Sequence, residues 1–73
     1  MEKLAEHTYG SHIYMKILLN NNRIEEIDVF IREDGMLYRT SADNGAELDH
    51  TEEKKQQRKE LREEIIAAFH ALY

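Results

Sequence analysis

Five basic side chains recur at helical spacing in the last third of the chain. They are Lys54, Lys55, Arg58, Lys59 and Arg62. Residues three and four apart lie on one face of a helix, so this basic stripe predicts a single cationic surface. Such a surface can bind an anion or an acidic partner. The alternative, which we favour for a charge run of this kind, is a solvated helix whose bases pair with acids elsewhere in the chain.

Four histidines raise the question of a metal site. His7, His12, His50 and His70 contain no pair at the i, i+4 spacing of a helical metal motif. The chain has no cysteine, which excludes thiolate ligands and disulfides. It also has no nucleophile motif, and its three glycines form no phosphate-binding loop. We therefore expect a protein without a metal, a cofactor or enzymatic activity.

Size and charge limit the function classes further. With 73 residues the chain is one domain (1–73), and a domain of this size buries only about 60% of its unfolded surface. So small a core favours further burial against a partner protein or a second copy. The net charge of −5 disfavours nucleic acid as the partner, because neutralising phosphate supplies most of the affinity of nucleic-acid binders. No apolar run suits a signal peptide or a membrane span, so we expect a cytoplasmic protein that does not enter membranes.

Residues 12–41 contain three runs of alternating apolar and polar residues, which predict a three-stranded antiparallel meander. Asn20–Asn22 forms the first turn, because asparagine tolerates the left-handed backbone conformation. A loop of three or five residues there places Ile17 beside apolar residues of the next strand. A two-residue loop would instead bury the Glu26 carboxylate opposite Ile17, so we reject it.

Asp34 and Gly35 predict the second turn. They have the composition of a two-residue type I′ loop, in which both central residues have positive φ. Such a loop pairs Ile31 with Tyr38 and starts the third strand at Met36.

A long helix is predicted over residues 49–73, a run without proline or glycine. Asp49 is the expected N-cap because Glu52 follows three residues later, and Thr51 is the alternative cap. Residues 1–9 are expected to form a short N-terminal helix or to be disordered, since Leu4 and Ala5 are their only adjacent apolar pair. The predicted fold is therefore an α+β domain, with a three-stranded meander and one long C-terminal helix packed on one face.

One helix can cover only one of the two faces of a sheet. The face expected beneath it carries Ile13, Met15, Ile17, Leu19, Ile27, Val29, Ile31, Met36 and Tyr38. The opposite face carries Tyr14, Leu18, Phe30 and Leu37 among charged residues. Apolar anchors within a polar rim are typical of a protein interaction surface. The alternative is that residues 1–9 fold back and cover this face.

The order helix, three strands, helix resembles that of double-stranded RNA-binding domains, in element order only. In that family a basic cluster at the start of the last helix contacts phosphate. Lys54, Lys55, Arg58 and Lys59 lie in the corresponding place, so the resemblance implies a phosphate contact there.

These observations lead to two hypotheses from different classes. The leading one is a small, non-enzymatic protein–protein interaction module, an adaptor, regulator or inhibitor of a larger complex. It binds through the helix-free sheet face and also forms a homodimer. The alternative is a nucleic-acid-binding protein that uses the basic stripe.

Overall fold

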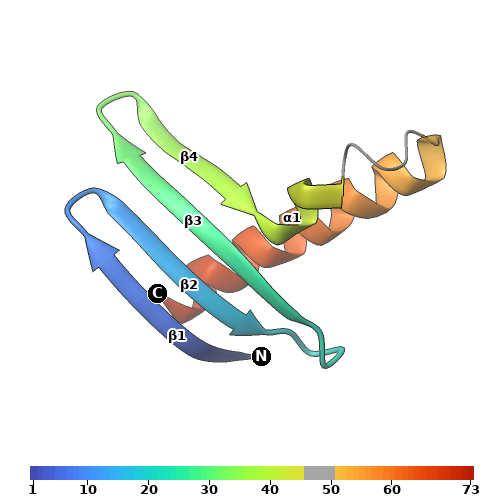
Figure 1. Cartoon of the computed structure of the whole chain (residues 1–73), viewed down its shortest axis with the longest axis horizontal. Coiled ribbons are helices and arrows are strands. Elements are labelled where there is room, and N and C mark those ends of the chain that lie inside the picture. Colours follow the sequence, from blue (N-terminus) through green and yellow to red (C-terminus); the bar gives the residue numbers. More distant parts are fainter. Residues whose placement is uncertain (46–50) are drawn as a thin grey trace.

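Four strands follow one another along the chain before the long helix begins (Figure 1). The computed structural model describes residues 1–45 and 51–73. Its elements are β1 (Glu2–Tyr9), β2 (His12–Leu18), β3 (Ile24–Arg32), β4 (Gly35–Thr40), the short 3₁₀ segment η1 (Ser41–Gly45) and α1 (Glu52–Leu72). The strands form one antiparallel sheet in the order β1-β2-β3-β4. The α+β class and the C-terminal helix are confirmed, but the sheet has four strands instead of three.

The additional strand is β1, where we expected a short helix or disorder. It pairs with β2 from Glu2 to Tyr9, with a bulge between Lys3 and Ala5. Gly10 follows at φ 58°, the positive value that a two-residue hairpin turn needs at its first central position. The prediction was wrong because it required apolar side chains to hold this segment. An edge strand needs few of them, since β2 supplies its backbone hydrogen bonds.

This correction also removes the resemblance to double-stranded RNA-binding domains. The observed order is four strands followed by one helix, so no helix precedes the meander among residues 1–45.

The pairing of β2 with β3 follows the predicted register. Residues 19–23 form a five-residue loop between Leu18 and Ile24, and Met15 pairs with Ile27. Asn22 has φ 65°, the left-handed conformation expected of this turn. A carboxylate is nevertheless buried beside Ile17, because its partner Glu25 is only 9% exposed. We did not expect this burial. Glu25 lies near the start of β3, on the same face as the core.

The pairing of β3 with β4 differs from the prediction by two residues. Ile31 pairs with Met36 and not with Tyr38, and the turn consists of Glu33 and Asp34. Gly35 has φ 133°, but it lies after the turn, and neither turn residue has positive φ. The loop is therefore not the expected type I′ turn. A shift of two residues keeps every side chain on its expected face.

The core lies between α1 and one face of the sheet. Its largest fully buried side chains are Phe69, Met15, Ile17, Ile27, Ile65 and Val29. Figure 1 shows α1 crossing the strands at a steep angle, so that its first turns extend past β4. Accordingly, the described residues from Glu52 to Gln57 are all exposed, whereas Ile65, Ala68 and Phe69 are buried.

Two residues expected in the core lie outside it. Ile31 is 43% exposed and Met36 is 50% exposed. They form a cross-strand pair beside the β3–β4 turn. Because α1 crosses the strands instead of running along them, it does not cover this end of the hairpin (Figure 1).

The helix begins after Thr51, which was the alternative cap. The Thr51 Oγ1 atom accepts a hydrogen bond of 3.3 Å from the Lys54 backbone N–H. The predicted cap Asp49 lies outside the described residues. No helix in the described part of the chain is long and apolar enough to cross a membrane.

Candidate functional site

The side of the sheet opposite α1, called here the outer face, carries a layer of aromatic and charged side chains. Residues that alternate with the core positions of each strand point to this side. The predicted patch residues Tyr14, Leu18 and Phe30 are half-buried there, and Leu37 is 38% exposed. β1 extends the outer face sideways and does not fold over it (Figure 1). The alternative in which residues 1–9 cover this face is therefore wrong.

Phe30 lies at the centre of a row that crosses all four strands. This row, called here the aromatic row, consists of Tyr9, His12, Phe30 and Leu37. The His12 ring stacks on Phe30 with 4.5 Å between ring centroids and 5° between ring planes. On the β4 side, the guanidinium carbon of Arg39 lies 5.8 Å from the centroid of the same ring. Both neighbours therefore hold Phe30 in place without covering the row, and Tyr9 at its end is 71% exposed.

The next row is more polar. It consists of His7, Tyr14, Asp28 and Arg39. The His7 and Tyr14 rings stack with 5.9 Å between centroids. Asp28 Oδ1 lies 2.8 Å from His12 Nε2, which ties this row to the first. The outer face is thus a network in which rings and polar groups fix one another.

The arrangement of the rings determines what the outer face can bind. His12 with Phe30 and His7 with Tyr14 stack face against face. A ring whose face contacts a neighbour has less of that face free for a nucleic-acid base, and stacking on a free face is how single strands bind to sheets. Edges, hydroxyl groups and the Leu37 side chain remain for contact. These groups suit a flat protein surface better than a row of bases.

The hydroxyl of Tyr14 lies in a polar contact that changes its pKa. Its hydroxyl donates a 2.6 Å hydrogen bond to Glu26 Oε2. This bond, together with partial burial and the nearby charges of Glu26 and Asp28, raises the pKa of Tyr14 to about 12. The phenol is therefore neutral at physiological pH and acts as a hydrogen-bond donor that orients Glu26.

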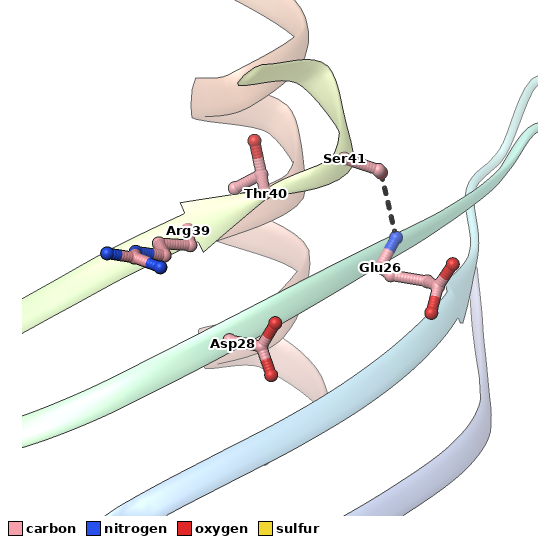
Figure 2. Close-up of a pocket in the computed structure, with 5 residues that line it drawn as sticks. All are labelled: Glu26, Asp28, Arg39, Thr40 and Ser41. Carbon is pink, nitrogen blue, oxygen red and sulfur yellow. Dashed lines mark hydrogen bonds between the residues drawn. The ribbon is translucent and has the colours of Figure 1, made fainter. Parts of the chain in front are cut away.

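A polar hollow of about 280 Å³ lies between β3 and β4 (Figure 2). Its lining is Glu26, Asp28, Arg39, Thr40 and Ser41. The Ser41 hydroxyl accepts a 2.9 Å bond from the Glu26 backbone N–H, which closes one end of the hollow. In Figure 2 the Arg39 guanidinium extends away from both carboxylates. The hollow is therefore acidic, and it lies next to the aromatic row.

The four residues of the predicted patch do not form one cluster. Phe30 and Leu37 are direct cross-strand partners, and Tyr14 lies in the adjacent row. Leu18 pairs with Ile24 at the other end of β2. A strand rises about 3.3 Å per residue, so Leu18 lies about 20 Å along β2 from His12 of the aromatic row. The row of Lys16 and Glu26 lies between them.

The basic stripe is also divided. Arg62 Nη2 donates a 3.1 Å bond to the Tyr38 carbonyl, and Arg62 Nε lies 3.6 Å from Asp43. Asp43 in turn accepts a 3.0 Å bond from the Thr40 backbone N–H. The backbone groups of Tyr38 and Thr40 project from the same edge of β4, so Arg62 and Asp43 cover part of the sheet edge that no described strand pairs.

The other four bases of the stripe have different surroundings. Lys55 Nζ lies 3.7 Å from Glu52 on the same helix. Lys54 and Arg58 line a hollow with Arg23 of the β2–β3 loop, which we had not considered. Lys59 is exposed. Within the described residues, none of the five pairs with an acid of β1–β4.

The described histidines have different partners. His12 bonds with Asp28, and the His70 Nε2 atom lies 2.8 Å from the Tyr38 hydroxyl. No group of three or more potential metal ligands occurs among the residues that the structure describes. His50 lies outside them.

Sequence reasoning missed His7 and Tyr9 as members of the outer face. Both were assigned to a segment without sheet structure. The signal was present in the alternation of Ala5, His7 and Tyr9, with Gly10 and Ser11 following as a two-residue turn.

No protein-family model, curated protein or solved structure matches this chain significantly.

Proposed function

We propose that this protein is a small, non-enzymatic protein–protein interaction module, an adaptor, regulator or inhibitor of a larger complex, that docks through the outer face. The observation that carries the proposal is the aromatic row of Tyr9, His12, Phe30 and Leu37 on a face that no element of the described chain covers. A sheet face that meets only water needs no such row, because short polar side chains suffice there.

The network on the outer face favours docking over chance exposure. His12, Arg39 and Asp28 hold the Phe30 ring and each other in defined positions. Side chains that are already ordered lose less conformational entropy when a partner binds. Aromatic residues and arginine are also the residue types that contribute most to protein interfaces.

Charge indicates which kind of partner fits. The chain carries a net charge of −5, and Glu26 and Asp28 line the hollow beside the aromatic row. We therefore expect a partner protein that presents lysine or arginine to the hollow and apolar side chains to Leu37 and Tyr9. A second copy fits less well, because it brings the same net negative charge.

Nucleic-acid binding has less support as a second function. Arg62 and Lys55 of the basic stripe have partners within the chain, which leaves fewer cations for successive phosphates. The stacked rings of the outer face do not favour a base-stacking platform either.

The test uses two adjacent residues of β4 that point to opposite faces. Leu37 is 38% exposed on the outer face, and Met36 is 50% exposed on the face of the core. Leu37→Asp and Met36→Asp make the same change of charge one residue apart. Affinity capture with the tagged full chain, followed by titration of the purified partner, measures binding by both variants.

We expect Leu37→Asp to weaken binding at least tenfold, the effect of losing about 1.4 kcal/mol. Met36→Asp should bind as the unmodified chain does. Equal loss in both variants, or loss only in Met36→Asp, would refute docking through the outer face. Light scattering of the unmodified chain shows whether the bound partner is a second copy.

A further inference from the structure

Three basic side chains from two separate elements surround a hollow of about 170 Å³ on the helix side of the molecule. They are Arg23 from the β2–β3 loop and Lys54 and Arg58 from α1, with Gln57 and Leu61 completing the lining. We propose that this basic hollow is a binding site for a single phosphate group. The site is independent of the outer face, because α1 supplies four of its five lining residues.

Among the described residues, few acids compensate the charges in the basic hollow. Arg23 Nη2 lies 3.6 Å from Glu25 Oε2, and within the described residues neither Lys54 nor Arg58 takes part in a salt bridge. Arg58 is also half-buried, so it has lost part of its hydration. Cations that approach one another without a counter-ion repel, and a bound anion relieves that repulsion.

The backbone around Arg23 is fixed before any ligand arrives. Leu19 donates a 2.8 Å bond to the Arg23 carbonyl, and the Arg23 N–H donates 3.1 Å to Asn21 Oδ1. On the other side, the Lys54 N–H is bonded to the Thr51 cap. Both elements that carry the cations are therefore held by local hydrogen bonds, which lowers the entropic cost of binding.

The donor set indicates the chemical class of the ligand. Two guanidinium groups offer paired N–H donors that match phosphate oxygens, and lysine adds a point charge. The Gln57 amide can donate one further bond. A single terminal phosphate fits better than a nucleic-acid backbone, because the neighbouring bases Lys55 and Arg62 are paired with Glu52 and Asp43.

The experiment is an NMR titration of the full chain with inorganic phosphate at constant ionic strength, with chloride as the reference anion. We expect saturable shifts around Arg23, Gln57 and Leu61, with a dissociation constant below about 10 mM. Arg23→Gln combined with Arg58→Gln should raise that constant at least about tenfold, through the loss of two charge-assisted contacts. The matched control is Lys59→Gln, which removes one charge from the same helix outside the hollow and should change the constant less than about twofold.

Replacing Arg23 also removes its contact with Glu25. The single variant Arg58→Gln keeps that contact and should still raise the dissociation constant for phosphate. Shifts that are absent, that do not saturate, or that weaken equally in Lys59→Gln would overturn the proposal. So would binding of duplex RNA without any binding of inorganic phosphate, because that result indicates a polyanion surface instead of a site for one phosphate.

Discussion

The two faces of the sheet are built from the same strands but are stabilised in different ways. On the side of α1, apolar side chains such as Met15, Val29 and Phe69 are completely or almost completely removed from water. On the outer face, Phe30 and Tyr14 stay half exposed and are positioned by stacked rings and short polar contacts. The first face therefore provides most of the folding free energy, and the second remains available for a partner.

The first test replaces one phenylalanine on each face with alanine, and it has the largest expected effect on stability. Phe69→Ala should cost about 3–5 kcal/mol of unfolding free energy, because it empties a fully buried site. That loss is close to the whole stability that so small a core supplies. Phe30→Ala should cost only about 1 kcal/mol, because its ring is partly solvated already. Urea unfolding followed by circular dichroism measures both, and equal losses would contradict the comparison.

A second test replaces each of two adjacent glutamates of β3 with methionine. Glu25 is buried on the core side, and its Oε2 atom has no hydrogen-bond partner among the described residues. Removing one partner of a buried ion pair is costly when the other charge stays buried, but Arg23, the partner of Glu25, is 57% exposed and remains solvated. We therefore expect Glu25→Met to change the free energy of unfolding by about 0 to +1 kcal/mol.

Glu26→Met on the outer face removes the acceptor of the Tyr14 hydroxyl. We expect it to destabilise the protein by about 0.5 kcal/mol. The smaller loss is thus expected on the covered face, which is the reverse of the order expected for the phenylalanines. The Ser41 hydroxyl donates a 3.2 Å bond to Glu25 Oε1, and Arg23 lies 3.6 Å from Oε2. A loss above about 2 kcal/mol in Glu25→Met would show that these two contacts outweigh the cost of burying the Glu25 carboxylate.

The smallest expected effect at neutral pH comes from Tyr14, which also adds a pH dependence in the alkaline range. Its pKa is raised to about 12 in the folded protein, against about 10 for an unfolded chain. The fold therefore favours the neutral phenol, so its contribution to stability is complete below about pH 10 and is lost as the pH rises from 10 through 12.

Tyr14→Phe should remove this alkaline loss and cost about 0.5 kcal/mol at neutral pH. Ultraviolet titration of tyrosinate should show that the component titrating near pH 12 disappears in the variant. If that component persists in Tyr14→Phe, it belongs to another tyrosine and the raised pKa is wrongly assigned to Tyr14.

The sequence was sufficient to predict the meander, the helix and most of the core, because these depend on the alternation of apolar residues. Ile13, Met15, Ile17, Ile27 and Val29 are all buried as expected. The outer-face positions of Tyr14, Phe30 and Leu37 follow from the same alternation.

The parts that were not predicted depend on contacts between different segments. β1 is held mainly by backbone pairing with β2, and its signal in the sequence is limited to the alternation of Ala5, His7 and Tyr9 before the Gly10-Ser11 turn. Arg62 matches its neighbours in the basic stripe, and only its contact with Tyr38 shows that it closes the β4 edge. Arg23 of the β2–β3 loop lines the same hollow as Lys54 and Arg58 of α1, although the two elements are far apart in the sequence. Single-residue patterns carry no information on such contacts.

The most direct test of an open outer face is the accessibility of its side chains with and without the captured partner. NMR relaxation by a soluble paramagnetic agent should broaden the signals of Tyr9 and Leu37 in the isolated chain but not those of Ile17 and Ile65. In the complex, Tyr9 and Leu37 should become protected while Met36 stays accessible. Outer-face signals that are already protected in the isolated monomer, or that stay accessible in the complex, would contradict the account.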